Sequence, residues 1–156
     1  MAVAPIPAGY ATITPYLIVD AAVKAIEFYK KAFDAKEIFR MDGPNGSIVH
    51  AELQIGDSRI MLADEMGAMY QSAKALGSTP VSFMVYVENV DARFAQALAA
   101  GATVKRPVAD QFYGDRTGTL VDPFGHVWSL GTHVEDVAPD EMDRRLRELM
   151  ASGGMG

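Results

Sequence analysis

The sequence predicts an α+β protein built from two tandem βαβββ modules and a C-terminal helix. The stretch GDRTGTLVDPFGHVWSL at residues 114–130 has strand-like runs on both sides of a Pro-Gly turn, which predicts a β-hairpin. Shifting the sequence against itself by 68 residues aligns apolar positions along both halves, for example Leu17 with Val85 and Leu62 with Leu130. Each half then follows the order strand, amphipathic helix and three more strands.

Composition excludes several kinds of protein. Hydrophobic residues at 49% and charged residues at 22% are ordinary for a globular chain of 156 residues. The absence of cysteine excludes disulfides and thiolate sites. A net charge of -6 argues against a nucleic-acid partner. No apolar run approaches the about 18 residues of a membrane span, so we expect no membrane partner and a cytoplasmic location.

The expected organisation is one domain with short terminal segments. We predict a flexible N-terminus over 1–10, a single domain over 11–137, a C-terminal helix over 138–150 and a disordered tail over 151–156. The domain divides into a first module at 11–63, a connector at 64–79 and a second module at 80–132.

The first module opens with a strand and a helix. Residues 12–19 alternate, with Leu17 and Val19 expected toward the core and Tyr16 on the other face. Asp20 is placed to cap a helix that runs to about Phe33. An apolar stripe at helical spacing, predicted to pack in the core, consists of Val23, Ile26, Phe28, Tyr29 and Phe33.

After a short strand at 36–41, two further strands at 47–55 and 58–63 are predicted to form a hairpin through a two-residue turn, Gly56-Asp57. The face expected under the helix carries Val49, Ala51, Leu53, Ile55, Ile60 and Leu62, and the other carries Ile48, His50, Glu52, Gln54, Arg59 and Met61. The second face is too polar for a core. It suits either the wall of a cavity or a solvated surface with a Glu52–Arg59 pair.

The connector contains Met66, Met69 and Tyr70, which suit either a lid over an apolar ligand or simple packing. The second module repeats the order of the first. Its first strand begins near Pro80, its helix starts at Asn89 or Asp91 and ends at Gly101, and a further strand covers 103–108 before the hairpin. The C-terminal helix is amphipathic and is expected to cover the sheet or a partner subunit.

These features together resemble the vicinal oxygen chelate superfamily, which includes glyoxalase I, bleomycin-resistance proteins and extradiol dioxygenases. The resemblance rests on the two modules, FYKKAF in the first helix, HAELQIGDSRIMLAD and GDR..G...DPFGH.WSL followed by THVED. It covers about residues 11–137, and the sequence motifs are most similar to those of the PhnB-like branch. The resemblance implies a homodimer, with cavities often built from modules of two chains.

Metal-dependent members of this superfamily carry ligands at four places, usually His and Glu. The resemblance places them at Thr14, Met61, Ser82 and Ser129, and the shift of 68 residues relates the first pair to the second. Hydroxyls and a thioether are poor ligands for such metals, so the expectation is no metal and no cofactor. Zn, Ni, Mn or Fe would be the alternative.

Other side chains are candidates for a site. His50 and Glu52 lie two apart on one strand face, as an acid-base pair or half of a displaced metal site. His126 and His133 suit structural or solvated positions, and Trp128 suits the core. Arg116 could ion-pair within the fold or hold an anionic ligand. Ligand-binding candidates are Tyr16, His50, Glu52, Met61, Ser82, Met84, Tyr86, Tyr113, Arg116 and Ser129.

Two functions follow from these observations. The preferred one is a metal-free module that binds a small hydrophobic or aromatic molecule, a cationic compound among them, in a sheet-lined cavity, as bleomycin-type resistance proteins do. The alternative is an enzyme of glyoxalase, dioxygenase or isomerase type that uses His50 and Glu52. The amino-acid sequence does not support a phosphonate ligand, because it shows no glycine-rich phosphate loop and no Lys or Arg cluster.

Overall fold

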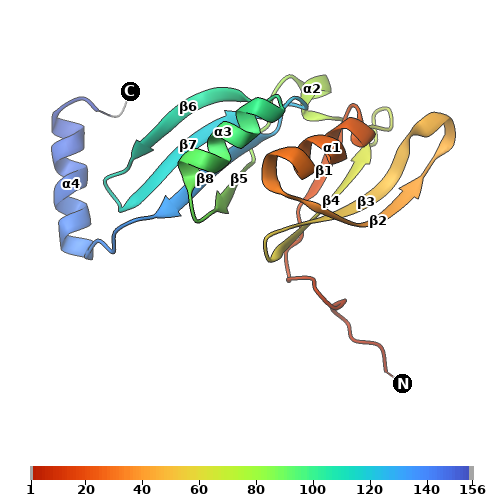
Figure 1. The fold of residues 1–156 in the computed structure, drawn as a ribbon, viewed down its shortest axis with the longest axis horizontal. Helices are drawn as coiled ribbons and strands as arrows, with labels where there is room; N and C mark the ends of the chain where they lie inside the picture. Colours follow the sequence, from red (N-terminus) through yellow and green to blue (C-terminus); the bar gives the residue numbers. More distant parts are fainter. Residues whose placement is uncertain (1, 155–156) are drawn as a thin grey trace.

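The computed structural model describes residues 2–154 and consists of two four-stranded sheets, each covered on one face by a helix (Figure 1). The first module contains β1 (Tyr16–Val19), α1 (Ala22–Phe33), β2 (Lys36–Asp42), the 3-10 turn η1 (Pro44–Gly46), β3 (Ile48–Ile55) and β4 (Ser58–Asp64). The second contains β5 (Ser82–Tyr86), α3 (Val90–Ala100), β6 (Thr103–Asp110), β7 (Asp115–Val121) and β8 (Val127–His133), and α2 (Ala73–Leu76) lies in the connector. The predicted α+β fold of two βαβββ modules is confirmed.

Both sheets have the same topology. Their strand orders are β1-β4-β3-β2 and β5-β8-β7-β6, with the first pair of each sheet parallel and the others antiparallel. The predicted two-residue turn is confirmed, since Ile55 pairs with Ser58 and Glu52 with Met61. The side-by-side helices α1 and α3 join the two modules (Figure 1).

The DPFGH.W motif forms the joint between the modules. Asp122 is buried and its Oδ2 accepts hydrogen bonds from the hydroxyl of Tyr29 at 2.7 Å and from Nε1 of Trp128 at 2.9 Å. Its Oδ1 accepts from the backbone N–H groups of Phe124 and His126, both at 2.9 Å. Because Tyr29 belongs to α1, the hairpin turn of the second module holds the helix of the first. The motif is therefore structural, and Trp128 lies in the core as predicted.

His126 extends this joint to the first sheet. Its Nε2 lies 3.0 Å from the backbone oxygen of Ile18 in β1. The structural interpretation of this histidine agrees with that contact.

The predicted faces of β3 are wrong at one end. Ile48 is 1% exposed and Val49 is 44% exposed, the reverse of the prediction. The reason is a β-bulge, because Met41 pairs with His50 whereas Asp42 pairs with Ile48 and leaves Val49 unpaired. A bulge of one residue moves the following side chain to the other face. From His50 onward the predicted alternation holds.

The start of the chain also differs from the prediction. The first strand begins at Tyr16, and Ile13 is exposed. Asp20 does not cap α1; its carboxylate contacts Lys74, and the N–H of Ala22 donates to Oδ1 of Asp64 at 2.7 Å instead. Val23 is exposed, because it lies on the outer side of α1. In the second module Asn89 caps α3 and Gly101 ends it, as predicted.

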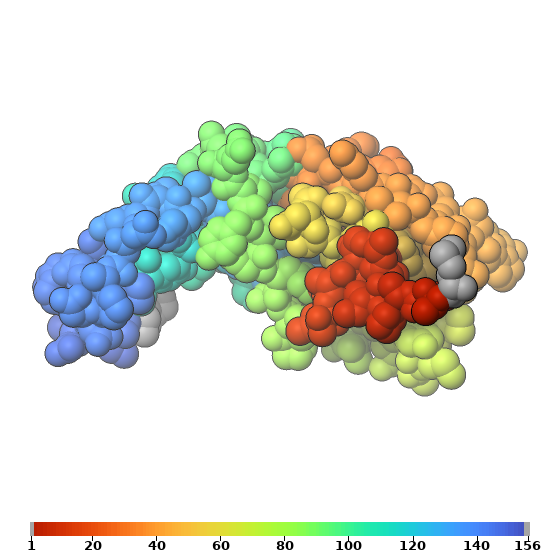
Figure 2. Space-filling model, turned by 90° about the horizontal axis from the view of Figure 1, so that it is seen from below, coloured from red at the N-terminus to blue at the C-terminus, as the bar shows by residue number. Residues whose placement is uncertain are grey.

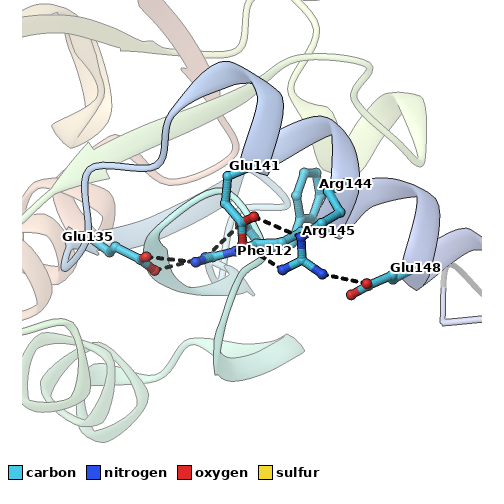
Figure 3. A network of polar contacts seen from close by, with 6 residues as sticks. All are labelled: Phe112, Glu135, Glu141, Arg144, Arg145 and Glu148. Carbon is cyan, nitrogen blue, oxygen red and sulfur yellow. Dashed lines mark hydrogen bonds and ion pairs between the residues drawn. The ribbon is translucent and has the colours of Figure 1, made fainter.

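The C-terminal helix α4 (Pro139–Ala151) lies beyond the end of the second sheet and does not cover its face (Figure 1). Arg145 holds it there by bonding the Glu135 carboxylate and the backbone oxygen of Phe112 (Figure 3). Coverage by a partner subunit stays a prediction. Of the predicted disordered tail, Ala151 is helical, and residues 155–156 lie outside the described part of the chain.

The terminal and connector segments show a few defined contacts. Residues 2–10 form no helix or strand, and Met1 lies outside the described residues. In the connector, Met66 forms an isolated bridge with Tyr70, and both side chains are exposed, as is Met69. Its role as a lid stays a prediction. Among residues 2–154, no helix is long and apolar enough to cross a membrane.

Candidate functional site

The predicted polar face of the first sheet is the face opposite α1. We call it the first open face and define it by Tyr16, His50, Glu52, Gln54, Arg59 and Met61. These residues alternate with Leu17, Ala51, Leu53 and Leu62, which are buried in the core. Tyr16 remains 49% exposed. The strand period of two thus separates a packed face from one that is partly accessible.

Three of the predicted residues form a hydrogen-bonded chain on this face. The hydroxyl of Tyr16 on β1 lies 2.8 Å from Nδ1 of His50 on β3. Nε2 of the same imidazole lies 3.1 Å from Oε1 of Glu52. Since ionised Glu52 can only accept, Nε2 donates to it, and in the neutral imidazole Nδ1 accepts from Tyr16. The chain therefore runs Tyr16 to His50 to Glu52.

The N-terminal segment completes this chain, which the sequence did not predict. The hydroxyl of Tyr10 donates to Oε2 of Glu52, and the Arg59 guanidinium lies over the Tyr10 ring at 4.5 Å from its centroid. Figure 2 shows the red N-terminal segment in front of the first module, and Figure 1 shows that it runs away from the first sheet toward the N-terminus. Tyr10 sits in a segment with no strand or helix pattern, so no sequence signal placed it here.

The surroundings set the protonation states of this chain. Hydrogen bonding from Tyr10 is the main reason that the pKa of Glu52 lies below its ordinary value; burial opposes it, and His50 adds to it. Burial raises the pKa of Tyr16 above its ordinary value, and nearby Tyr70 and Glu52 add to the rise. At neutral pH Glu52 is therefore an anion and Tyr16 a neutral donor.

Apolar side chains border the polar chain. Phe39 on β2 lies 6.3 Å from the His50 ring, centroid to centroid, and is 47% exposed. Met41, which pairs with His50 across β2 and β3, is also exposed. An aromatic ring and a thioether next to a few directed polar groups is the usual composition of a small-molecule site.

The four places implied for family metal ligands do not form a metal site. Thr14 precedes β1, Met61 pairs with Tyr16, and Ser82 and Ser129 lie on the second sheet. Hydroxyls and a thioether do not fit a divalent metal. Among residues 2–154 no three His, Asp or Glu side chains cluster as metal ligands do. His50 fits no better, since each of its ring nitrogens already contacts a side chain.

The second sheet also has a face opposite its helix, which we call the second open face. It carries Tyr86, Met84, Ser82, Ser129, Thr119 and Asp115. Tyr86 donates to Oδ2 of Asp115 at 2.7 Å, and Nδ1 of His133 lies 2.7 Å from Oδ1 of the same carboxylate. Nε2 of His133 lies 2.9 Å from Asp136. Tyr113, in the β6–β7 loop, stacks edge-on against Phe112.

The second open face differs from the first in how its charged groups shift the pKa of its histidine. The two carboxylates raise the pKa of His133, with Asp115 the larger cause and Asp136 the smaller. Burial pushes the pKa of Asp115 upward, but hydrogen bonds from His133 and Tyr86 outweigh it and hold the pKa below its ordinary value. The sequence did not predict that Asp115 bonds both Tyr86 and His133, because these contacts depend on the pairing of β5, β8 and β7.

One predicted residue lies on the wrong side of this sheet. Arg116 bonds Asp91 of α3 at 2.8 and 2.9 Å and Asp110 at 3.0 Å. It shares the helix-covered face with Gly118, where an added Cβ would lie 2.7 Å from the Phe94 ring of α3. Of its two predicted roles, the contacts match the ion pair and not the ligand site.

Two hollows adjoin these faces. A cavity of about 550 Å³ lies on the second open face and includes Ser82 and Ser129. A crevice of about 1140 Å³ lies between the modules, where Ile60, Phe83 and Trp128 meet Met84 and Tyr86. Both are in or near the size range of small-molecule sites.

Comparison with known proteins agrees with this architecture. Residues 9–130 match the family model described as Glyoxalase/Bleomycin resistance protein/Dioxygenase superfamily. The chain belongs to this superfamily. The predicted resemblance is thereby confirmed.

Relatives of the superfamily extend over nearly the whole chain. Mb0911c of Mycobacterium bovis, described as uncharacterised, is 45% identical over 148 residues, which cover 92% of this chain and 95% of that protein. TioX from Micromonospora sp. ML1 is similar in structure, with a TM-score of 0.65 and 27% identity over 80% of this chain and 99% of TioX. The PhnB protein from Bacillus cereus shares the fold, with a TM-score of 0.63 and 21% identity over 78% of this chain and 99% of its own.

Proposed function

We propose that this protein binds a small hydrophobic or aromatic molecule at the first open face without a metal. The observation that carries the proposal is the hydrogen-bonded chain Tyr16–His50–Glu52, next to exposed Phe39 and Met41 on β2. Directed donors and acceptors beside apolar surface give both orientation and affinity. The Glu52 anion beside aromatic rings also suits a cationic ligand.

A screen of aromatic and cationic compounds by chemical-shift mapping tests the proposal. A true ligand shifts amides of β1, β3 and β4, and His50→Ala lowers its affinity by about tenfold or more, since a directed hydrogen bond is lost. Lys24→Ala, on the helix covering the other face, is the matched control and keeps full affinity. Shifts confined to Ile60, Phe83 and Trp128 would place the ligand in the crevice between modules and overturn the proposal.

Metal content distinguishes the metal-free proposal from its alternative. Elemental mass spectrometry of tag-free protein, before and after incubation with Zn, Ni, Mn and Fe(II), is expected to show no stoichiometric metal. Near-stoichiometric metal that disappears in His50→Ala would contradict it.

The hydrogen-bonded chain Tyr16–His50–Glu52 also supports acid-base catalysis as a second candidate function. His50 can take a proton from Tyr16 or from a ligand, and the Glu52 anion stabilises the imidazolium that forms. An isomerase or lyase acting by proton transfer needs this arrangement and no metal. Turnover of a bound compound, lost in Tyr16→Phe with binding retained, would favour the enzyme; binding without turnover favours the binding protein.

We further propose that the protein is a homodimer, as the family resemblance implies. Both open faces expose large side chains, including Tyr16, Phe39 and Tyr86, the last 63% exposed. A second chain that covers them would remove this surface from water. Analytical ultracentrifugation should give twice the 16.8 kDa chain mass. A monomer at micromolar concentration would contradict this part of the proposal.

A further inference from the structure

The cavity on the second open face differs from the first open face in charge. Two cationic side chains, Lys105 and Arg106, line it together with the hydroxyl-bearing residues Ser82, Thr119 and Ser129. No carboxylate is among its lining residues. This is unusual in a chain with 20 acidic and 14 basic residues.

A β-bulge explains why two consecutive residues share one cavity. Val104 pairs with Leu120 and Arg106 with Thr119, so Lys105 has no partner in the β6–β7 ladder. Successive side chains of a regular strand point to opposite faces, but a bulge turns both toward one side. The edge position of β6 and Pro107 next to the bulge are consistent with this irregularity.

Both cations have unused hydrogen-bonding capacity. Arg106 makes one long contact, 3.5 Å from Nη2 to the hydroxyl of Thr119, and Thr119 lies 2.9 Å from the hydroxyl of Ser129. Within residues 2–154 neither Lys105 nor Arg106 lies within ion-pair distance of a carboxylate. By contrast, Arg116, Arg144 and Arg145 each bond two carboxylates.

We infer that this cavity is an oxyanion subsite for a phosphate, phosphonate, sulfonate or carboxylate group of a small molecule. A guanidinium fork and an ammonium group neutralise such a group, and the hydroxyls of Thr119 and Ser129 supply further donors. A volume of about 550 Å³ leaves room for more than the anionic group alone. The Lys-Arg cluster that the linear sequence did not reveal is thus created by two adjacent residues and a bulge.

This inference goes beyond the proposed function, because its residues are separate from the first open face. Titration of the full-length protein with inorganic phosphate and with acetate, at constant ionic strength set with NaCl, tests it. We expect saturable amide shifts at Ser82, Thr119 and Ser129. Arg106→Gln should lower phosphate affinity about tenfold or more, and Lys105→Gln should also weaken it.

Arg147→Gln is the matched control, since Arg147 is a cation of α4 without an ion pair among residues 2–154, and it should bind phosphate as the wild type does. His50→Ala should also leave phosphate binding unchanged. The phosphate titration can therefore be interpreted even if no ligand is found for the first open face. Thermal unfolding of each variant verifies that it is folded. Phosphate shifts that are absent, that chloride reproduces, or that persist in Arg106→Gln would overturn the inference and leave both cations as solubilising charges of an edge strand.

Discussion

The two modules share one fold but arrange the same three side-chain types differently on their open faces. In the first module, His50 is in the middle, between Tyr16 and Glu52. In the second module a carboxylate is in the middle, because Asp115 bonds both Tyr86 and His133. A histidine beside a tyrosine can accept its proton, whereas two neighbouring carboxylates raise the pKa of His133 above its ordinary value. The two histidines therefore differ in their partners, which are a phenol and one carboxylate for His50 and two carboxylates for His133.

The two edge strands, β2 and β6, also differ in the side chains that their bulges present. The first bulge of β2 leaves Ile38 unpaired, and the first bulge of β6 leaves Lys105 unpaired. The next residues, Phe39 and Arg106, pair with Glu52 and Thr119. The bulge at Ile38 therefore presents apolar surface and the bulge at Lys105 presents charge. Fold and register are repeated, and the chemistry is set by the side chains placed on them.

The largest expected effect comes from breaking the joint that has no counterpart in the first module. At the β3–β4 hairpin of the first module, the last polar side chain of β3 is Gln54, which bonds, among residues 2–154, the backbone oxygen of its own turn and Arg59. Asp122→Ala removes four hydrogen bonds and leaves the buried Tyr29 hydroxyl and Trp128 N–H unpaired. We expect a loss of about 3–5 kcal/mol in the free energy of unfolding, measured with urea.

Gln54→Ala is the control for this comparison and should cost no more than about 1 kcal/mol. Equal losses in the two variants would show that Asp122 is not the special link between the modules.

An intermediate effect is expected from removing the N-terminal contact that only the first module has. Glu52 has a lower pKa in the folded protein than its ordinary 4.5, so its ionised form stabilises the fold above about pH 4.5, and this contribution is lost as the pH falls through the folded pKa. Tyr10→Phe removes the main cause and should raise the Glu52 pKa. It should cost about 1 kcal/mol at neutral pH and reduce the loss of stability between about pH 5 and pH 3.

Carboxyl ¹³C titration of Glu52 measures the pKa, and urea unfolding at several pH values measures the stability. Tyr16→Phe is the control, because Tyr16 contacts His50 and not Glu52. A Glu52 pKa unchanged by Tyr10→Phe would mean that the N-terminal segment does not hold this carboxylate in solution.

Periodicity predicted the modules, the β3–β4 turn and the polar face, because each depends on local alternation and turn chemistry. It also placed Tyr16, His50 and Glu52 on one face. Ile48 and the Lys105–Arg106 pair were misjudged because bulges depend on pairing between strands. Contacts of Tyr10 and of Asp122 join segments far apart in the chain, and no local pattern encodes them.

The smallest expected effect concerns the histidine of the second module. Its pKa is raised above the ordinary 6.5 by Asp115 first and Asp136 second, so protonated His133 stabilises the fold below about pH 6.5, and this contribution is lost as the pH rises through the folded pKa. Asp136→Asn should lower the His133 pKa without restoring its ordinary value, because Asp115 remains 2.7 Å from Nδ1. Imidazole ¹H–¹⁵N titration measures it, and Asp143→Asn on α4 is the charge-matched control. If Asp136→Asn leaves the pKa unchanged, His133 is held by Asp115 alone, and the second module then has a single carboxylate per histidine, as the first module does with His50 and Glu52.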